Sequence, residues 1–372
     1  MPLRNKEKDK TVKILENITD SVLREDIEKL AECTFLDELK ENASVLITGA
    51  TGLIGSQIVW ALACHSAAKQ KKLRILALVR NEAKARAAFR DLLDAGLVML
   101  CIGDIVEPLQ ISHPVDYIIH GASATSSRYF VEKPVETIVT ALKGTQNVLE
   151  FARQKQVQKV VYLSSLEVYG TPDNTKEYIA EEDYGYIDPM QVRSSYSEGK
   201  RMAECMCVSY AKEYGVPVVV ARLSQTFGPG VAYNDGRVFA EFARCAIEKR
   251  DIVLHTQGKT LRTYCYLRDA ISGLFCLMLR GEAGQAYNVT NMETAITIRD
   301  MAELVCTITP GIKVVIDIPQ DIASFGYNPE MVIRLDSRKL QNLGWMPEVK
   351  IEEMFRRLIS SMVSERAESG NA

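Results

Sequence analysis

Residues 44–55 read SVLITGATGLIG, a short apolar run that breaks into three glycines, each three residues after the last. The run predicts a buried strand, and the residues after it (53–68) predict a helix. Of the three, Gly49 permits a tight turn, Gly52 lets the backbone approach a pyrophosphate, and Gly55 lets helix pack on strand. The helix N-terminus adds unpaired N–H groups and a positive dipole end. We therefore expect a dinucleotide to bind at this turn.

The rest of the chain continues the alternation of apolar strands and longer helices. We expect further strands at 74–79, 98–104, 115–122, 159–165 and 216–224. We expect the intervening helices at 81–95, 134–154 and 196–215. Short apolar strands separated by helices indicate a parallel sheet covered on both faces. The predicted fold class is α/β, a Rossmann-type doubly wound parallel sheet with a smaller C-terminal α/β substrate lobe.

The domain boundaries follow from changes in this pattern. Residues 1–42 are polar with one apolar helical face, and they form a helical N-terminal extension that packs on the body or on a second subunit. Residues 43–224 form the NAD(P)-binding Rossmann domain, to which 268–290 return. Residues 225–267 and 291–372 form the substrate-binding lobe over the carboxyl edge of the sheet, where open α/β sheets bind ligands.

Composition excludes several classes of protein. The 372 residues are 47% hydrophobic and 25% charged, with a net charge of −3, so no basic excess marks a nucleic-acid surface. No apolar stretch is long enough for a signal peptide or a membrane span, so we expect a cytoplasmic protein. Nine scattered cysteines without a C-x-x-C pair, and four distant histidines, predict reduced thiols and no bound metal.

The end of the second strand bears on the choice of cofactor. An acidic residue there accepts a hydrogen bond from the ribose of NAD, whereas an arginine pairs with the 2′-phosphate of NADP. Here the strand ends LALVRN, with Arg80 at that point. Arg80 favours NADP, unless it is only a solvated charge that begins the next helix.

Five motifs together resemble those of the extended short-chain dehydrogenase/reductases that act on nucleotide sugars. They are TGATGLIG (48–55), GDI (103–105), HGAS (120–123), Tyr196-Ser-Glu-Gly-Lys200 and LGWMP (343–347). The resemblance covers roughly residues 44–360. It implies that the cofactor contacts, besides the three glycines and Arg80, are Thr51, Leu53, Ile54, Asp104, Ile105, Ala122, Ser123, Tyr196 and Lys200.

The Tyr-x-x-x-Lys motif implies a proton-transfer site. Tyr196 and Lys200 lie four residues apart on a predicted helix and therefore share a face. A free tyrosine has a pKa near 10, and a neighbouring ammonium and a cationic nicotinamide would lower it. The tyrosine then takes the proton of the C4 hydroxyl while hydride leaves for the cofactor. Ser165 is expected to orient that hydroxyl, and Lys200 to hold the nicotinamide ribose.

LSSLEVYG (163–170) narrows the resemblance further. In the dehydratase and decarboxylase branches a glutamate stands two residues after the catalytic serine or threonine, as Glu167 does after Ser165. It implies a second step beyond hydride transfer. The dehydratases use an aspartate between the two as the acid for the leaving hydroxyl. Here that position is Leu166, which cannot donate a proton, so decarboxylation is favoured over 4,6-dehydration.

The substrate contacts also come from the resemblance. SSYSEGKR (194–201), TFGPG…NDGRV (226–238) and LRTYCYLRD (261–269) are similar to the UDP-glucuronate decarboxylase branch. Arg262 is a candidate for the substrate diphosphate or carboxylate, since a guanidinium fork suits either anion. Arg237 is a second candidate for the diphosphate, or else each arginine forms a salt bridge within the lobe. Gln225 stands where decarboxylases tend to have asparagine. The remaining candidates are Ser126 and Thr226.

These observations predict an NAD(P)-dependent enzyme that acts on a nucleotide-diphosphate sugar by C4 oxidation, with UDP-glucuronate decarboxylation as the first reading. The alternatives are a 4-epimerase, an NADPH-dependent 4-ketosugar reductase, and a non-catalytic NAD(P)-binding protein. Arg80 favours NADP, whereas an enzyme that regenerates its own cofactor generally keeps NAD. Relatives commonly dimerise through two long helices, here 134–154 and 196–215, so we expect a homodimer.

Overall fold

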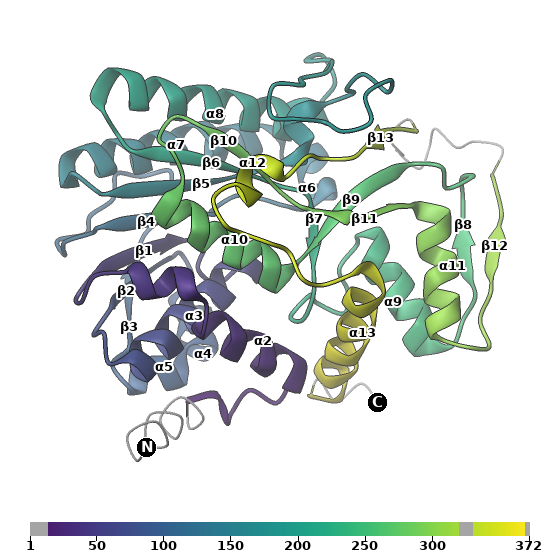
Figure 1. Ribbon diagram of the computed structural model, residues 1–372, viewed down its shortest axis with the longest axis horizontal. Coiled ribbons are helices and arrows are strands. Elements are labelled where there is room, and N and C mark those ends of the chain that lie inside the picture. Colours follow the sequence, from purple (N-terminus) through teal and green to yellow (C-terminus); the bar gives the residue numbers. More distant parts are fainter. Residues whose placement is uncertain (1–13, 320–329, 369–372) are drawn as a thin grey trace.

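A seven-stranded parallel sheet forms the centre of the molecule (Figure 1). The computed structural model describes residues 14–319 and 330–368. From one edge of the sheet to the other, the strands are β10 (Ala286–Val289), β6 (Val218–Leu223), β5 (Lys159–Ser165), β4 (Tyr117–His120), β1 (Ser44–Thr48), β2 (Arg74–Val79) and β3 (Val98–Ile102). Every neighbouring pair is parallel. The α/β, Rossmann-type prediction is therefore confirmed.

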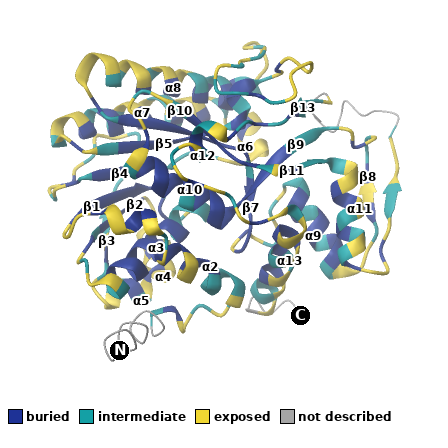
Figure 2. Ribbon diagram, in the orientation of Figure 1, coloured by how far each residue is buried: buried dark blue, intermediate teal, exposed yellow. Residues whose placement is uncertain are grey.

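Helices cover both faces of this sheet, and alternate strand residues face each layer. In β1, Val45 and Ile47 pack with α3 (Leu53–Lys69) and α10 (Leu267–Arg280). Leu46 packs with α7 (Pro134–Lys155) and α8 (Ser194–Tyr214). Because side chains alternate along a strand, a strand buried on both faces is apolar throughout. Figure 2 shows the sheet as the most buried part of the molecule.

The strand order reverses between β1 and β4. The chain runs outward through β2 and β3 and then returns to β4 on the other side of β1. Crossovers on opposite sides leave a crevice at the carboxyl ends of these two strands, where α/β proteins bind their ligands. The glycine turn follows β1, and the HGAS segment follows β4. The Ser165 end of β5, the next strand, lies along the same edge.

The smaller lobe extends from this edge, at the right of Figure 1. Its strands are β7 (Gln225–Phe227), β8 (Ile252–Leu254), β9 (Leu261–Tyr266), β11 (Asn291–Thr297), β12 (Val314–Ile316) and β13 (Val332–Ile333). Its main helices are α9 (Val238–Glu248), α11 (Ile298–Ile308) and α13 (Ile351–Glu368). These helices share an apolar core, so the lobe is stabilised apart from the main sheet.

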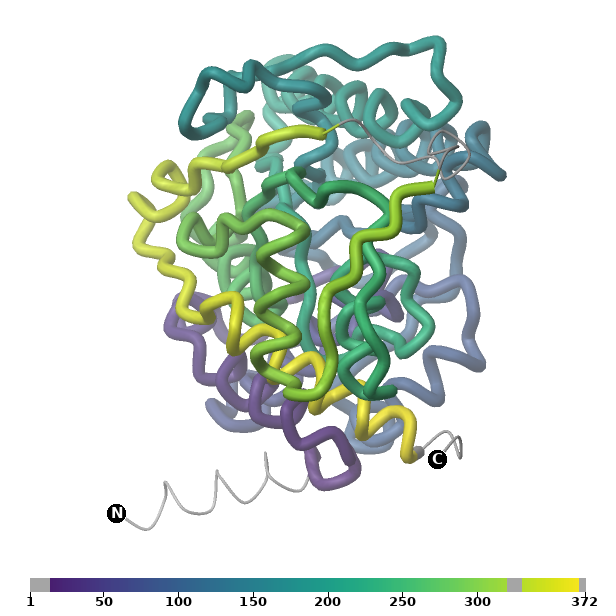
Figure 3. Tube along the Cα trace, turned by 90° about the vertical axis from the view of Figure 1, so that its right-hand side faces the viewer, coloured from purple at the N-terminus to yellow at the C-terminus, as the bar shows by residue number. Residues whose placement is uncertain are grey.

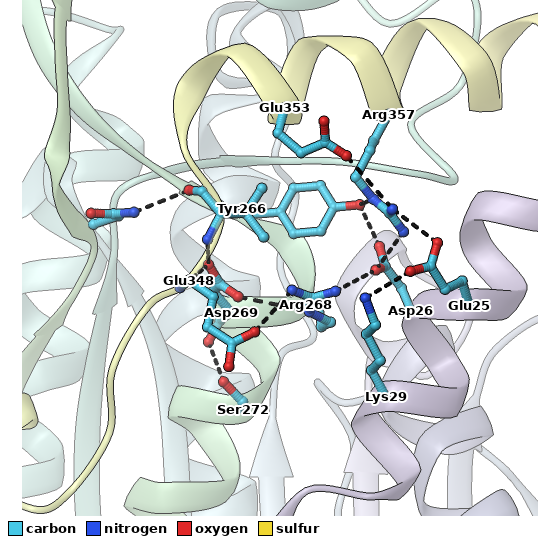
Figure 4. A network of polar contacts seen from close by, with 12 residues as sticks. Glu25, Asp26, Lys29, Tyr266, Arg268, Asp269, Ser272, Glu348, Glu353 and Arg357 are labelled. Carbon is cyan, nitrogen blue, oxygen red and sulfur yellow. Dashed lines mark hydrogen bonds and ion pairs between the residues drawn. The ribbon is translucent and has the colours of Figure 1, made fainter.

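The N-terminal extension packs on the body of the same chain. Its helix α2 (Ser21–Ala31) begins at Asp20, whose carboxylate accepts from two backbone N–H groups of the first turn. The helix lies against α3, α10 and α13, and Figure 3 shows it beside the yellow α13. At this joint the buried Asp26 meets Tyr266, Arg268 and Arg357 (Figure 4). The extension therefore joins the main domain to the lobe.

The remaining elements are short. They are the helices α4 (Glu82–Ala88), α5 (Arg90–Asp94), α6 (Ser127–Glu132) and α12 (Arg338–Gln341), and the 3₁₀ turns η1 (Thr34–Glu38) and η2 (Leu166–Tyr169). The single helix predicted over 81–95 is two helices, which meet at the buried Phe89. All nine cysteines are free thiols. Within the described ranges no helix is long and apolar enough to cross a membrane, and no cluster of metal-ligating side chains occurs.

Candidate active site

The three glycines of the turn have separate geometric roles. Gly49 has a φ of +69°, and a Cβ there would lie 2.8 Å from the carbonyl carbon of Gly121. A Cβ on Gly55 would lie 2.3 Å from the Gly49 carbonyl oxygen, so any side chain would push helix α3 off the strand. Gly52 precedes the first turn of α3 and offers no capping side chain. The uncapped N–H groups and the bare backbone fit a pyrophosphate.

The other predicted cofactor residues surround this turn. Leu53 and Ile54 open helix α3 and pack partly on the core, and Thr51 lies in the turn itself. The Ala122 N–H donates to Thr48 Oγ1 over 3.1 Å, which ties the segment after β4 to the end of β1. Three further predicted residues lie in the adjoining loops. Ile105 packs against Gly144, and Asp104 accepts a hydrogen bond from the Val106 N–H. Ser123 donates to the Ala124 carbonyl.

Arg80 and Asp104 come together at the far end of the crevice, beyond β2 and β3. The Arg80 Nη1 lies 3.6 Å from Asp104 Oδ2, and the arginine side chain is 77% exposed. An ion pair this exposed contributes little stability, so the guanidinium is free to turn toward a ligand. The structure thus brings together two of the predicted cofactor residues, Arg80 and Asp104.

Ser165, Tyr196 and Lys200 meet at the end of β5. Tyr196 and Lys200 lie on one face of α8, and both are buried. The Lys200 ammonium donates to the Leu163 carbonyl over 2.7 Å, which leaves protons of the ammonium for another acceptor. The Tyr196 ring stacks on Phe130, with ring centroids 4.1 Å apart.

The pKa values of this group reflect its burial. Burial, with a smaller contribution from the Glu167 carboxylate, raises the pKa of Tyr196 to about 12, although a hydrogen bond with Ser165 and the charge of Arg193 act in the opposite direction. Burial lowers the pKa of Lys200 to about 8, against the attraction of Glu204. The protein alone therefore does not produce the lowered tyrosine pKa expected from the sequence, because desolvation outweighs the hydrogen bond of Ser165 and the charge of Arg193.

Glu167 is held by two residues that sequence reasoning missed. Arg193 Nη2 donates to the Glu167 carboxylate over 2.8 Å, and Ser197 Oγ donates to its other oxygen over 3.0 Å. Arg193 also lies over the Phe130 ring, 4.9 Å from its centroid. Its position just before the Tyr196 helix was the available signal. The carboxylate is therefore fixed at the rim, beside Ser165 and Tyr196.

Leu166 points into an apolar cluster of its own. This cluster joins η2 to strand β13 of the lobe and to the loop after η2, and it contains Leu166, Val168, Tyr169, Ile179, Ile333 and Leu335. Leu166 is almost completely buried in it. The residue that departs from the dehydratase pattern thus has a packing role. Its contact with the lobe could not be read from the sequence, because Ile333 and Leu335 lie far along the chain.

The predicted substrate residues differ in how they are partnered. Among the described residues, the buried Nε of Arg262 on β9 has no hydrogen-bond partner, and its Nη2 lies 3.3 Å from the sulfur of Met331. Arg237 forms a two-point pair with Asp235, so its charge is already balanced. The other three line the same edge: Gln225 and Thr226 in β7, and Ser126 just before α6. Arg262 is therefore the better candidate for an anionic ligand.

Comparison with known proteins agrees with this geometry. The family model described as "NAD dependent epimerase/dehydratase family" matches residues 45–290. UDP-glucuronic acid decarboxylase 6 of Arabidopsis thaliana is 30% identical over 84% of this chain and 87% of its own. UDP-glucuronic acid decarboxylase 1 of Danio rerio is 31% identical over 92% of this chain and 78% of its own.

A solved structure shows the same fold at lower identity. UDP-glucose 4-epimerase from Thermotoga maritima, crystallised with UDP-glucose, superposes with a TM-score of 0.72 at 20% identity. The match covers 87% of this chain and 99% of that one. The glycine turn, the Ser165–Tyr196–Lys200 group and the matches in sequence lead to one conclusion: the chain belongs to the NAD dependent epimerase/dehydratase family and is an extended short-chain dehydrogenase/reductase enzyme of the nucleotide-sugar group.

Proposed function

We propose that this enzyme removes the C6 carboxylate of a UDP-uronic acid, with UDP-glucuronate as the substrate. The proposal rests mainly on how Leu166 and Glu167, the two residues after Ser165, are placed. Leu166 is enclosed in apolar packing and offers no acid for a leaving hydroxyl, while the Glu167 carboxylate is fixed at the rim by Arg193. Elimination of water needs such an acid, whereas decarboxylation does not.

The chain's residues would act in sequence around a bound NAD(P). The cofactor supplies a nicotinamide that takes a hydride from the sugar and returns it at the end. Tyr196 accepts the proton of the C4 hydroxyl, which Ser165 orients, and Lys200 holds the nicotinamide ribose. The C4 ketone would make the substrate a β-keto acid, so the electron pair of the C5–C6 bond could pass into a C4–C5 enolate as carbon dioxide leaves. A proton from water at C5 would convert this enolate to the C4 ketone of the pentose. The returned hydride, together with the proton held by Tyr196, would then restore the C4 hydroxyl.

Two anions of the substrate need cationic partners. Arg262 has a guanidinium without a carboxylate partner in the part of the chain that is described, and it lies on β9 of the lobe. We assign Arg262 to the substrate diphosphate or carboxylate, and Arg237, already paired with Asp235, to a secondary contact. Gln225 and Thr226 would contact the sugar, and Ser126 the edge of the pocket.

The test is incubation of the purified protein with UDP-glucuronate, and in parallel with UDP-glucose. We expect release of carbon dioxide and a UDP-pentose, identified by mass, without net consumption of cofactor at 340 nm. Inversion at C4 with the carboxylate retained would replace the proposal with a 4-epimerase. Stoichiometric loss of NADPH on a 4-ketosugar would replace it with a reductase, the second candidate, which the exposed Arg80 favours.

A second measurement decides between NAD and NADP. A reaction that regenerates its own cofactor favours NAD, while the position of Arg80 beside Asp104 favours the 2′-phosphate of NADP. Mass spectrometry of nucleotides released from the purified protein identifies the one that it retains.

We also propose that the protein is a homodimer through α7 and α8. These paired helices carry exposed apolar side chains, which are Val135, Ile138, Val139, Met202 and Val208. Such a group of apolar side chains on a helix pair is typical of a subunit interface. Light scattering after size exclusion should give twice the chain mass, and Val139→Glu should reduce it to one.

A further inference from the structure

The two serines at the end of β5 serve different partners. Ser165 lies at the rim and bonds with Tyr196, whereas Ser164 is buried and donates to the carboxylate of Glu204. Adjacent residues of a strand face opposite sides, so only one of the pair can face the substrate. The buried member is therefore available to fix the strand end from behind.

Glu204 lies one helical turn after Lys200 and two turns after Tyr196 on α8. This spacing places all three on one face of the helix. The carboxylate is buried, and it receives two bonds from Arg222 of β6, at 3.0 Å from Nε and 2.7 Å from Nη2. A two-point guanidinium pair fixes both the charge and the orientation of the carboxylate.

Arg222 extends this support to the far side of the site. Its Nη1 donates to the Tyr169 hydroxyl over 3.0 Å and to the Glu181 carbonyl over 2.6 Å, and Nη2 donates to the Tyr184 hydroxyl. Tyr169 closes the η2 turn that carries Glu167. One buried ion pair thus connects the catalytic helix, the end of β5 and the turn at the rim.

The charge of Glu204 also matters to Lys200. The titratable groups that face this ammonium, besides Glu204, are His120, Tyr162, Tyr196 and Cys207. Burial keeps each of these four neutral at neutral pH, because it lowers the pKa of His120 and raises the pKa of the two phenols and the thiol. Glu204 is the negative charge that this part of the described structure sets against the Lys200 ammonium.

We propose that Glu204 is a positioning residue of the catalytic group, which fixes the Ser164 end of β5 and supplies the counter-charge of the buried Lys200 ammonium. The proposal rests on the proposed function only in giving Lys200 the nicotinamide ribose as its ligand. Its predicted effect is electrostatic as well as structural. A neutral replacement would let Lys200 lose its proton at a lower pH.

The test is the pH dependence of NADH binding to the full-length protein without sugar, measured by cofactor fluorescence. In Glu204→Gln we expect the alkaline limb of the binding profile to move to lower pH by about one unit. Glu198→Gln is the matched control, because Glu198 lies on the same helix, is partly exposed and pairs only with Arg201. Ser164→Ala should slow turnover of UDP-glucuronate but leave the alkaline limb where it is.

A second variant guards against loss of folding. Glu204→Gln leaves Arg222 buried without its anion, so the pair Glu204→Gln with Arg222→Met, which removes both charges, should fold better. It should move the alkaline limb in the same direction but by less, because removal of the Arg222 cation offsets part of the effect on Lys200. An unmoved limb in a folded protein with either change overturns the proposal. Absence of turnover in the wild type would instead overturn the decarboxylase assignment, and the binding profile would still decide the role of Glu204.

Discussion

Two buried carboxylates, Asp26 and Glu204, are paired with arginines in the interior, and they lie in different regions of the molecule. Asp26, on the N-terminal extension, accepts from Tyr266 and pairs with Arg268 and Arg357 (Figure 4). Glu204, on α8, accepts from Ser164 and pairs with Arg222.

The two networks differ in what adjoins them. Around Asp26, the two arginines also form salt bridges at the surface, Arg357 with Glu25 and Arg268 with Glu348. This network joins a helix of the extension to the lobe. Around Glu204 the neighbours are Ser164 and Lys200. A buried ion pair is weak evidence of net stability, but it fixes a geometry. The comparison indicates that one network fixes an architecture and the other an active site.

The sharpest test of the site side is Tyr196→Phe. Without the hydroxyl, no group accepts the C4 proton, so kcat should fall about 1,000-fold, equivalent to about 4 kcal/mol of barrier. The ring still stacks on Phe130, so the melting temperature and NADH affinity should stay at wild-type values. If the variant turns over at the wild-type rate, Tyr196 does not accept the C4 proton. The Glu204 network would then not support a catalytic group.

The matching test of the architectural side is Asp26→Ala. It leaves Arg357 and Arg268 without their buried anion, so the free energy of unfolding should fall by about 3 kcal/mol. Turnover by the protein that remains folded should not change. Denaturant unfolding and single-turnover rates measure the two quantities. Glu25→Gln, at a partly exposed partner, is the control and should cost less than about 0.5 kcal/mol. A fall in kcat in folded Asp26→Ala would erase the distinction between the two networks.

The apolar cluster at Leu166 adjoins the active-site network, because it contains Tyr169, which Arg222 contacts, and it joins the rim turn to the lobe strand β13. Leu166→Ala removes a buried side chain from this cluster and should cost about 2–3 kcal/mol of stability. Thermal denaturation with and without cofactor measures the effect. If stability does not change, Leu166 has a role toward the substrate and not in packing.

Some of this arrangement was predictable from the sequence. The glycine spacing and the Tyr196–Lys200 spacing are local, so they specified the fold and the reacting group directly. The arginine partners of Asp26, and the lobe residues Ile333 and Leu335 that pack with Leu166, are not local, since they lie more than 150 residues away in sequence. Glu204 was visible as an acid one turn after Lys200, but its role became apparent only when β6 placed Arg222 beside it.

The protonation of His120 is a probe of the buried environment around Lys200. Burial and the Lys200 charge lower its pKa to about 3, so the folded protein holds the ring neutral, with bonds to Thr48 and Thr145. Its contribution to stability is complete above the unfolded pKa of about 6.5 and is lost as pH falls toward 3. At about pH 5 the loss is about 2 kcal/mol.

The variant His120→Asn should remove this part of the acid sensitivity. Asparagine can keep the bond to Thr48 but does not titrate, so the difference in unfolding free energy between wild type and variant should narrow from pH 7 to pH 5. Denaturant titrations at the two pH values measure it. A constant difference would mean that the ring takes up its proton over the same pH range in the folded and the unfolded protein.

The smallest effect is expected at Arg80, which belongs to neither network. Its guanidinium is exposed and lies 3.6 Å from Asp104, so Arg80→Asp should leave stability within about 0.5 kcal/mol of wild type. If Arg80 contacts the 2′-phosphate, the ratio of NADP to NAD affinity should fall about tenfold, or about 1.4 kcal/mol, because a carboxylate repels the phosphate and accepts from a free 2′-hydroxyl. Arg86→Asp, at an exposed arginine of the following helix, controls for the loss of surface charge. If the ratio of NADP to NAD affinity falls equally in both variants, the effect comes from the change in surface charge and not from a contact with the 2′-phosphate. Arg80 would then be a solvated surface charge, and other residues of the crevice would set the cofactor preference.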